Sequence, residues 1–151
     1  MKKSFRGLLA DGGQDRIRLQ TKKGKVGYRI VNFELISYKP VNVSHASVAM
    51  IWKTQQSSVP TDTPIIDFTD SSLLAAGMLT DNASLSYAAS KIIVFDQEIF
   101  NQDIYITHTD QEGTASLNYY LELEAIALDD KSAEYTTIKD LRGYTNINPW
   151  R

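Results

Sequence analysis

The stretch that decides the fold reads Leu117-Asn118-Tyr119-Tyr120-Leu121-Glu122-Leu123-Glu124-Ala125. Its odd-numbered positions are apolar or aromatic, whereas its even-numbered positions carry an amide, a tyrosine and two glutamates. Successive side chains of a β-strand point to opposite faces, so this pattern is typical of a strand with one face in a core. We therefore predict a strand within residues 114–128, the longest of the chain.

The same period of two recurs on both sides of this strand. Alternation is clear in residues 16–20, 26–35, 44–53 and 102–109; an apolar run at 91–95 predicts a strand buried on both faces, and 65–68 a short one. Residues 71–79 fit either a short helix or a strand. Turn residues predict two hairpins, one around 22–25 and one around Gly113.

Two adjacent apolar residues, Ile30 and Val31, restart the alternation on the other parity. Such a shift in mid-strand predicts a β-bulge or a strand that passes from one sheet to another. Many short strands without strand–helix–strand units predict an all-β fold, an antiparallel β-sandwich or jelly roll with one short C-terminal helix.

That helix is predicted over residues 132–142. Ser132 can cap its start, Tyr135, Ile138 and Leu141 recur at helical spacing, and Gly143 stands where a C-terminal cap belongs. A chain of 151 residues is the size of one domain. We expect a single domain over residues 1–143 and an extended tail over 144–151.

Composition excludes several kinds of chemistry. The absence of cysteine excludes disulfides and thiolate nucleophiles, and two histidines are too few for a multi-histidine metal cluster. His108 precedes Asp110 by two residues, but its parity places it on an inner face as a structural hydrogen bonder. The run Asp11-Gly12-Gly13-Gln14-Asp15 favours a turn over a calcium-binding loop. Glu122 and Glu124 are expected on a solvated strand face and not as an acid/base pair. We expect no catalytic residue, no metal and no cofactor.

Charge is divided unevenly along the chain. Residues 1–39 hold ten Lys or Arg against three acids, whereas residues 40–151 hold six against fifteen. The basic stretch can fold back on acids of the same molecule, or it can face the acidic surface of a neighbouring copy. Nucleic-acid binding is not expected, because the chain is acidic overall and has no nucleic-acid motif.

Seven residues are the candidate assembly contacts. A tryptophan that follows a proline near the chain end has no core role within its own segment, and aromatic anchors often dock on a neighbouring subunit. The candidates are this pair and five basic residues: Arg16, Arg18, Lys22, Lys23, Lys25, Pro149 and Trp150.

No segment predicts membrane attachment. The apolar run after the charged start stops at Asp11, and no window approaches the roughly 18 apolar residues of a spanning helix. We expect a soluble protein made in a cytoplasm, with no membrane partner.

Several segments resemble a family of small, largely uncharacterised proteins of marine tailed bacteriophages, found in virion gene clusters. They are residues 3–19, 27–33, 100–108, 118–124 and 135–142, among them Phe100-Asn101-Gln102-Asp103-Ile104-Tyr105 and Tyr135-Thr136-Thr137-Ile138-Lys139-Asp140. The resemblance implies a virion structural protein, such as a capsid decoration, vertex or tail component, and it carries no site residues with it. From the charge split and the candidate contacts we expect homo-oligomers, in contact with other virion proteins. A glycan- or receptor-binding module of the virion is the alternative.

Overall fold

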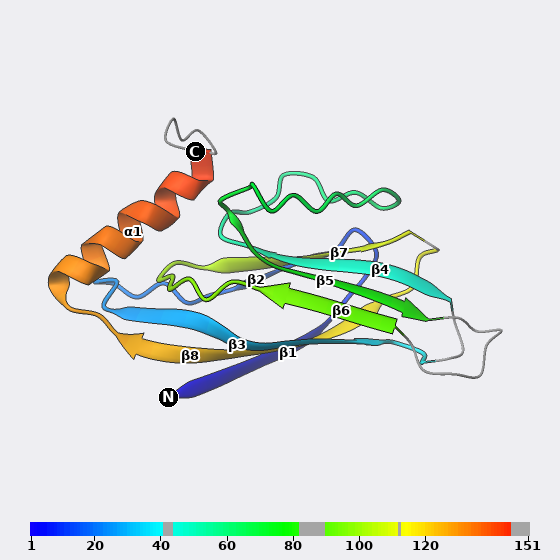
Figure 1. The fold of residues 1–151 in the computed structure, drawn as a ribbon, viewed down its shortest axis with the longest axis horizontal. Coiled ribbons are helices and arrows are strands. Elements are labelled where there is room, and N and C mark those ends of the chain that lie inside the picture. The colour runs from blue at the N-terminus through cyan, green and yellow to red at the C-terminus, as the bar shows by residue number, and fades with distance from the viewer. Residues whose placement is uncertain (41–43, 82–89, 112, 146–151) are drawn as a thin grey trace.

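A computed structural model describes residues 1–40, 44–81, 90–111 and 113–145. Within these ranges, only the backbone is described for His45 and for residues 142–145. Eight strands and one helix follow one another in these ranges (Figure 1). They are β1 (Lys2–Leu9), β2 (Gln14–Ile17), β3 (Val26–Ser37), β4 (His45–Trp52), β5 (Leu73–Asp81), β6 (Ser90–Phe95), β7 (Ile104–Asp110), β8 (Leu117–Ala127) and α1 (Asp130–Thr145). Over the described ranges, the chain has no helix with the length and apolar character needed to cross a membrane.

The strands form two facing antiparallel sheets, so the predicted all-β sandwich with one C-terminal helix is confirmed. The smaller sheet has the order β1-β8-β3, and the larger one β2-β7-β4-β5-β6. Strand β8 lies at the centre of the smaller sheet and is the alternating stretch of the sequence. With 11 residues it is not the longest strand as predicted, because β3 has 12. Its odd-numbered side chains from Leu117 to Leu123 are all buried, which the period of two predicts.

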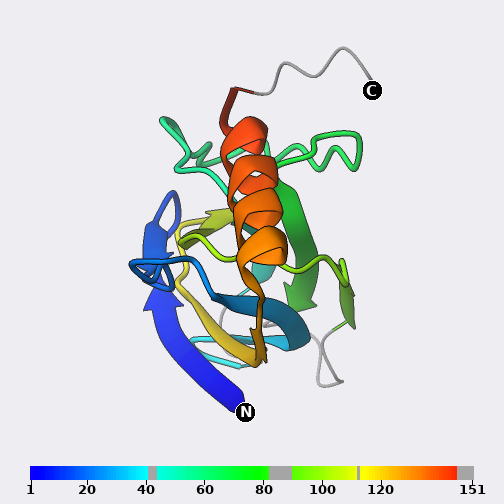
Figure 2. The same cartoon turned by 90° about the vertical axis from the view of Figure 1, so that its left-hand side faces the viewer.

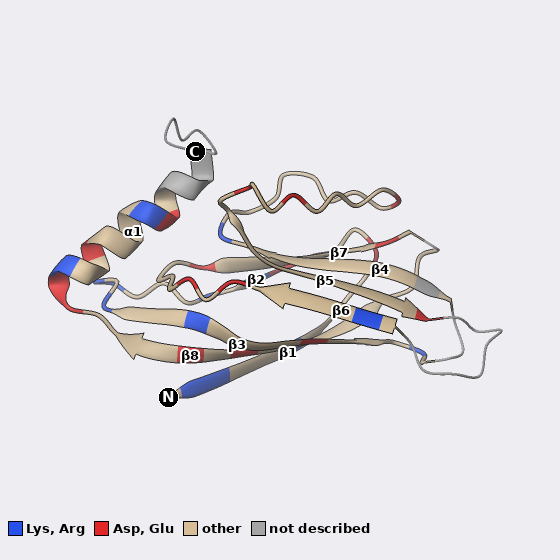
Figure 3. Ribbon diagram, in the orientation of Figure 1, with Lys and Arg blue, Asp and Glu red and all other residues tan. Residues whose placement is uncertain are grey.

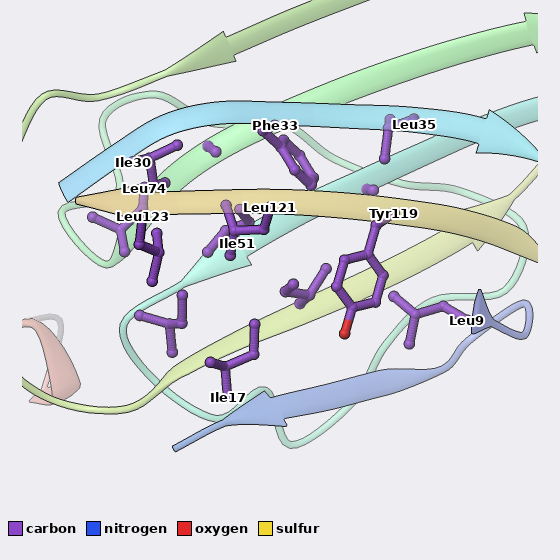
Figure 4. Packing of buried hydrophobic residues seen from close by; sticks show 14 of the residues in the cluster. Leu9, Ile17, Ile30, Phe33, Leu35, Ile51, Leu74, Tyr119, Leu121 and Leu123 are labelled. Carbon is purple, nitrogen blue, oxygen red and sulfur yellow. The ribbon is translucent and has the colours of Figure 1, made fainter. Parts of the chain in front are cut away.

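The core lies between the two sheets (Figure 4). Ile30, Phe33, Leu121 and Leu123 of the smaller sheet are at most 1% exposed and belong to the same buried cluster as Ile51 of the larger one. A second, smaller cluster lies on the outer face of the larger sheet and includes Met50 and Trp52 of β4.

Tyr119 ties the two sheets together at one edge. Its hydroxyl donates a hydrogen bond of 2.8 Å to Asp15 Oδ2 on β2. Strand β1 passes close over the ring, because a Cβ at Gly7 would lie 2.8 Å from the Cε2 and hydroxyl atoms of Tyr119. Glycine at residue 7 is therefore what allows β1 to cover this side chain.

Both predicted hairpins are wrong. Strand β2 pairs with β7 and β3 pairs with β8, so the turn at 22–25 joins strands of different sheets. The connection around Gly113 likewise joins β7 of the larger sheet to β8 of the smaller one. An alternating pattern specifies which face of a strand is apolar but not which strand lies beside it, and that is why the pairing was mistaken.

The strand order is close to that of a jelly roll, in which connections repeatedly cross between two sheets. A complete jelly roll would pair β6 with β3. Here β6 is hydrogen-bonded to β5, and it meets β3 through the ion pair of Lys91 with Glu34. The predicted bulge is confirmed, since the register of β3 against β8 shifts between Ile30 and Asn32.

Two further strand predictions need correction, and one alternative is decided. Residues 65–68 form no strand. Residues 71–79, for which a short helix or a strand was expected, belong largely to strand β5. The strand at 91–95 exists as β6, but it is an edge strand with Ile92 and Val94 exposed instead of buried on both faces.

Helix α1 is longer than predicted at both ends. Its cap is Asp129, whose Oδ1 accepts a hydrogen bond of 2.7 Å from the backbone N–H of Ser132. The helix continues through Gly143 to Thr145, so the predicted tail does not begin at residue 144. Pro149 and Trp150 lie outside the described residues. Seen down the long axis of the molecule, α1 runs in front of one end of the sandwich (Figure 2).

Candidate assembly surface

Polar groups make most of the contacts that hold α1 against the sandwich. The inward side chains of the helix are those of Ala133, Thr136 and Asp140, and all three are buried. Asn101 Nδ2, from the loop between β6 and β7, lies 3.2 Å from the carbonyl oxygen of Ala133 and 2.7 Å from Thr137 Oγ1. The same amide donates to the carbonyl oxygen of Gly24, so one side chain connects the helix to two loops.

A charged cluster lies beside this contact. The ammonium of Lys53, which follows β4, lies 2.5 Å from Glu98 Oε2 and 4.0 Å from Asp140 Oδ1. Lys139 adds a hydrogen bond of 2.8 Å to the carbonyl oxygen of Ile99 and an ion pair of 3.7 Å with Glu98. These contacts fix the rotation of α1 about its own axis.

Asp140 is the buried carboxylate of the cluster. Its Oδ2 accepts a hydrogen bond of 2.8 Å from the backbone N–H of Asn101. Its Oδ1 is buried and has no hydrogen-bond partner among the described residues. Burial raises the pKa of the Asp140 carboxyl to about 6, although the N–H of Asn101 and the nearby Lys53 and Lys139 act in the opposite direction.

Because the polar side of α1 faces the sandwich, its apolar stripe faces away. We call Tyr135, Ile138 and Leu141 the helix stripe; these side chains are 68%, 48% and 53% exposed. Viewed from the end of the molecule, α1 lies in front of the sandwich with no other described element before it (Figure 2). The helix stripe is thus accessible to another molecule along its length.

The predicted basic contacts are divided between internal pairs and free surface. Arg16 donates two hydrogen bonds, of 2.9 and 2.6 Å, to Asp103 Oδ2, and Lys25 lies 2.7 Å from Asp130 Oδ1. Lys2 and Arg29 pair with Glu122 and Glu124 in the same way. Arg18, Lys22 and Lys23 are exposed. The two halves of the chain therefore neutralise each other in part within one molecule. Figure 3 shows where the residues of each charge lie along the ribbon.

Asp103 also holds the backbone that follows β2. Its Oδ1 accepts hydrogen bonds from the N–H groups of Leu19 and Gln20, at 2.8 and 2.9 Å. Burial alone would raise the pKa of this carboxyl, but the two backbone hydrogen bonds and the Arg16 guanidinium lower it overall. Arg16 and Asp103 thus position the loop before β3.

His108 is a buried structural residue, as its parity predicts. Nδ1 lies 3.1 Å from the carbonyl oxygens of Leu9 and Ala10, and Nε2 lies 3.1 Å from Ser47 Oγ. Burial lowers the pKa of the imidazole. The carboxyl of Asp110 binds the backbone N–H groups of Ala46 and Ala115, which makes it a loop anchor.

The acidic run at 11–15 is divided between a turn over residues 10–13 and the start of strand β2. Gly12 has a φ of 76°, and Asp11 Oδ1 accepts a hydrogen bond of 2.8 Å from the N–H of Asp110. Asp15 receives the hydroxyl of Tyr119, so the two carboxylates serve different contacts. No group of three His, Asp or Glu side chains in the described ranges could hold a metal ion.

A shallow groove lies over the outer face of the smaller sheet. Its volume is about 680 Å³, and its lining includes Arg6, Leu8, Glu34, Ile36 and Tyr120. A second pocket, of about 320 Å³, lies between β4 and the loop over 53–72. There the indole N–H of Trp52 donates to Thr107 Oγ1 at 2.9 Å, so this tryptophan is part of the packing.

No protein-family model, curated protein or solved structure matches the chain. The helix stripe was visible in the sequence as an apolar repeat, but its outward direction was not. The Lys53–Asp140 cluster was missed, because these residues are far apart in sequence. Its one signal is that Ala133, Thr136 and Asp140 share the helix face opposite the stripe.

Proposed function

We propose that the chain is a non-enzymatic structural subunit of a bacteriophage particle and acts by assembly. Its place would be that of a capsid decoration or cement protein, a vertex component or a tail component. The protein would be made in the host cytoplasm and end in the virion, in contact with other copies and other virion proteins. The observation that carries the proposal is the outward helix stripe.

An amphipathic helix on a single domain ordinarily turns its apolar side to the core. Helix α1 does the reverse, although rotation about its axis would bury Ile138 and Leu141 and gain roughly 25 cal/mol for each Å² removed from water. The contacts of Asn101, Lys53 and Lys139 maintain the outward orientation. Contiguous exposed apolar side chains with a polar rim mark an interaction surface more often than a solvent face.

The strand order supports the same proposal at a coarser level. Jelly-roll sandwiches occur in viral capsids and in lectins, so the architecture suits a particle subunit without specifying one. The resemblance of five sequence segments to phage virion proteins points in the same direction.

The groove on the smaller sheet favours a second candidate function, glycan or receptor binding. Tyr120 is 36% exposed at its lining, and Arg6, Glu34 and Asn118 supply polar groups beside the ring. A flat aromatic face with polar neighbours is what sugar recognition requires. In this reading the particle uses the sheet face, and the helix stripe has no role.

Particles of a phage that encodes the chain provide the test. We expect mass spectrometry to detect the protein in multiple copies, and Ile138→Asp to lower its incorporation by about tenfold or more, as expected for a central interface side chain. The matched control is Ile65→Asp, on a loop residue that is 72% exposed. Absence from particles, or equal incorporation of both variants, would contradict the proposal.

The second candidate has its own comparison. Tyr120→Ala should abolish glycan or host-cell binding without changing incorporation if the groove is a receptor site. Loss of host-cell binding in Tyr120→Ala with full incorporation of Ile138→Asp would favour the glycan function over assembly through the helix.

A further inference from the structure

We propose that the helix stripe binds the helix stripe of a second copy, with the two α1 helices antiparallel and a two-fold axis at Ile138. This inference rests on the proposed assembly function, and it identifies a second copy of the chain as the partner of the helix stripe. The resulting contact is isologous, meaning that the same patch serves both subunits.

The spacing of the stripe suits this symmetry. Tyr135 and Leu141 lie three residues on either side of Ile138. In an antiparallel pair centred on Ile138, position 138 meets its own copy, and Tyr135 of each helix meets position 141 of the other. The large ring thus packs twice against a branched aliphatic side chain, and all three apolar groups lie in one contact.

Charge complementarity selects the antiparallel direction. Position 134 is a glutamate and position 142 an arginine, each four residues from Ile138. The two-fold axis brings position 134 of one helix opposite position 142 of the other, so two opposite-charge pairs flank the apolar centre. A parallel pair would instead oppose like charges, and its helix dipoles would be aligned unfavourably.

The shape of the molecule leaves room for this pairing. Helix α1 lies at one end of the long axis of the sandwich, and both sheets extend away from it (Figure 1). Two copies joined at α1 would therefore lie end to end, with their sandwiches pointing in opposite directions. Neither sandwich needs to move for the two helices to approach.

Three side chains on each side make a small contact. Stable interfaces bury roughly 800 Å² per partner, more than the helix stripe can supply alone. We therefore expect weak pairing in solution, visible at high protein concentration, which becomes effective when a particle holds many copies close together.

A cysteine cross-link tests the symmetry directly, because the chain has no cysteine of its own. A disulfide requires Cβ atoms roughly 3.5–4.5 Å apart, a separation that a residue on the two-fold axis can reach. We expect Ile138→Cys to form a disulfide-linked dimer under mild oxidation at least about tenfold faster than the exposed control Ile65→Cys. Equal rates would overturn the proposal.

Charge reversal tests the register in sedimentation experiments on the full chain. Glu134→Arg should weaken dimerisation, and the double variant Glu134→Arg with Arg142→Glu should restore it, because each pair is re-formed with reversed signs. A double variant as weak as the single one would overturn the antiparallel register. Circular dichroism controls for folding in each case.

The remaining outcomes distinguish failure of self-pairing through the helix stripe from failure of the proposed assembly function. If the wild-type chain stays monomeric at all concentrations while Ile138→Asp is lost from particles, the partner is another virion protein; self-pairing is then overturned and the assembly function stands. If dimers appear only after truncation behind Thr145, residues 146–151 cover the stripe, and self-pairing is again overturned. Absence of the protein from particles contradicts the assembly function whatever the helices do.

Discussion

Asp140 is an ionisable residue in the contact between α1 and the sandwich, with a side chain that is 1% exposed. Its ordinary pKa is near 4, and burial raises the pKa to about 6 in the folded protein. The native state therefore binds this proton more tightly than the unfolded chain does. The stabilising contribution is complete below pH 4 and is lost as the pH rises through about 6.

The first prediction follows from that sign. At about 1.4 kcal/mol per pKa unit, the Asp140 contribution to the free energy of unfolding should fall by about 3 kcal/mol between pH 4 and pH 7. Asp140→Asn removes the titration, so its unfolding free energy should lack this fall and equal or exceed that of the wild type at pH 7. Urea unfolding at several pH values measures both.

Asp130→Asn is the matched control, because Asp130 lies on the same helix with its side chain 86% exposed. It should keep the pH dependence of the wild type. If Asp140→Asn lowers the free energy of unfolding at pH 7 by more than about 1 kcal/mol, the prediction is wrong. The attraction between Asp140 and Lys53 would then exceed the cost of burying the carboxylate.

Single residues also mark how far the sequence could be interpreted. The parity of His108 predicted its burial correctly, because alternation decides which face a strand residue joins. Nothing local predicted that Lys53 would be buried beside Asp140, since that contact depends on where α1 docks. Arg16 illustrates the same limit: its charge was evident, but its engagement by Asp103 was not.

At the scale of elements, α1 is an attachment to the sandwich more than a part of its core. The main buried cluster contains no residue of the helix, and Asn101 supplies most of the side-chain hydrogen bonds that hold α1. Regions with few buried apolar contacts open at lower free energy than the global fold. The helix should therefore be able to separate while both sheets stay intact.

Asn101→Ala tests that independence. The substitution leaves the buried carbonyl oxygens of Gly24 and Ala133 without this donor, a loss of about 1–3 kcal/mol for buried polar groups. We expect hydrogen exchange to accelerate about tenfold or more over residues 133–141 while the amides of β8 keep their protection. Asn118→Ala, the same change on β8, should leave helix exchange unaltered. Equal acceleration in β8 and α1 would mean that the helix opens only with the whole domain.

Elements were predicted more reliably than their partners. Strands β3, β4, β7 and β8 fall where alternation placed them, because a half-buried strand must have a period of two. The two hairpins failed because a tight turn and a crossing between sheets use similar turn residues. The apolar repeat predicted the helix, yet its polar face packs on the sandwich. The reason is that Asn101 of the sandwich provides buried hydrogen-bond partners for Thr137 and Asp140.

At the scale of the whole molecule, ion pairs within the fold partly neutralise the uneven charge of the two parts of the sequence. Four basic residues of the first 39 pair with acids beyond residue 100, and these pairs reduce the long-range attraction between copies. Arg18, Lys22 and Lys23 remain as exposed positive charge near the end of the molecule that carries α1. Self-association through the helix stripe should thus depend less on salt than a contact driven by the full charge split.

The last prediction concerns the shape of the paired molecule. A single copy of this length has a radius of gyration of about 15 Å. The longest strand has 12 residues and spans roughly 40 Å, so end-to-end copies would have centres about 50 Å apart. Small-angle scattering on the disulfide-linked Ile138→Cys dimer should then give a radius of gyration close to twice the single-copy value, whereas copies lying side by side would raise it by only about 1.4-fold. The reduced sample is the control, since it should return to the single-copy value at low concentration. A compact dimer would contradict the end-to-end arrangement, because helices that cross the end of each sandwich cannot pair symmetrically at Ile138 and also bring the two sheets face to face.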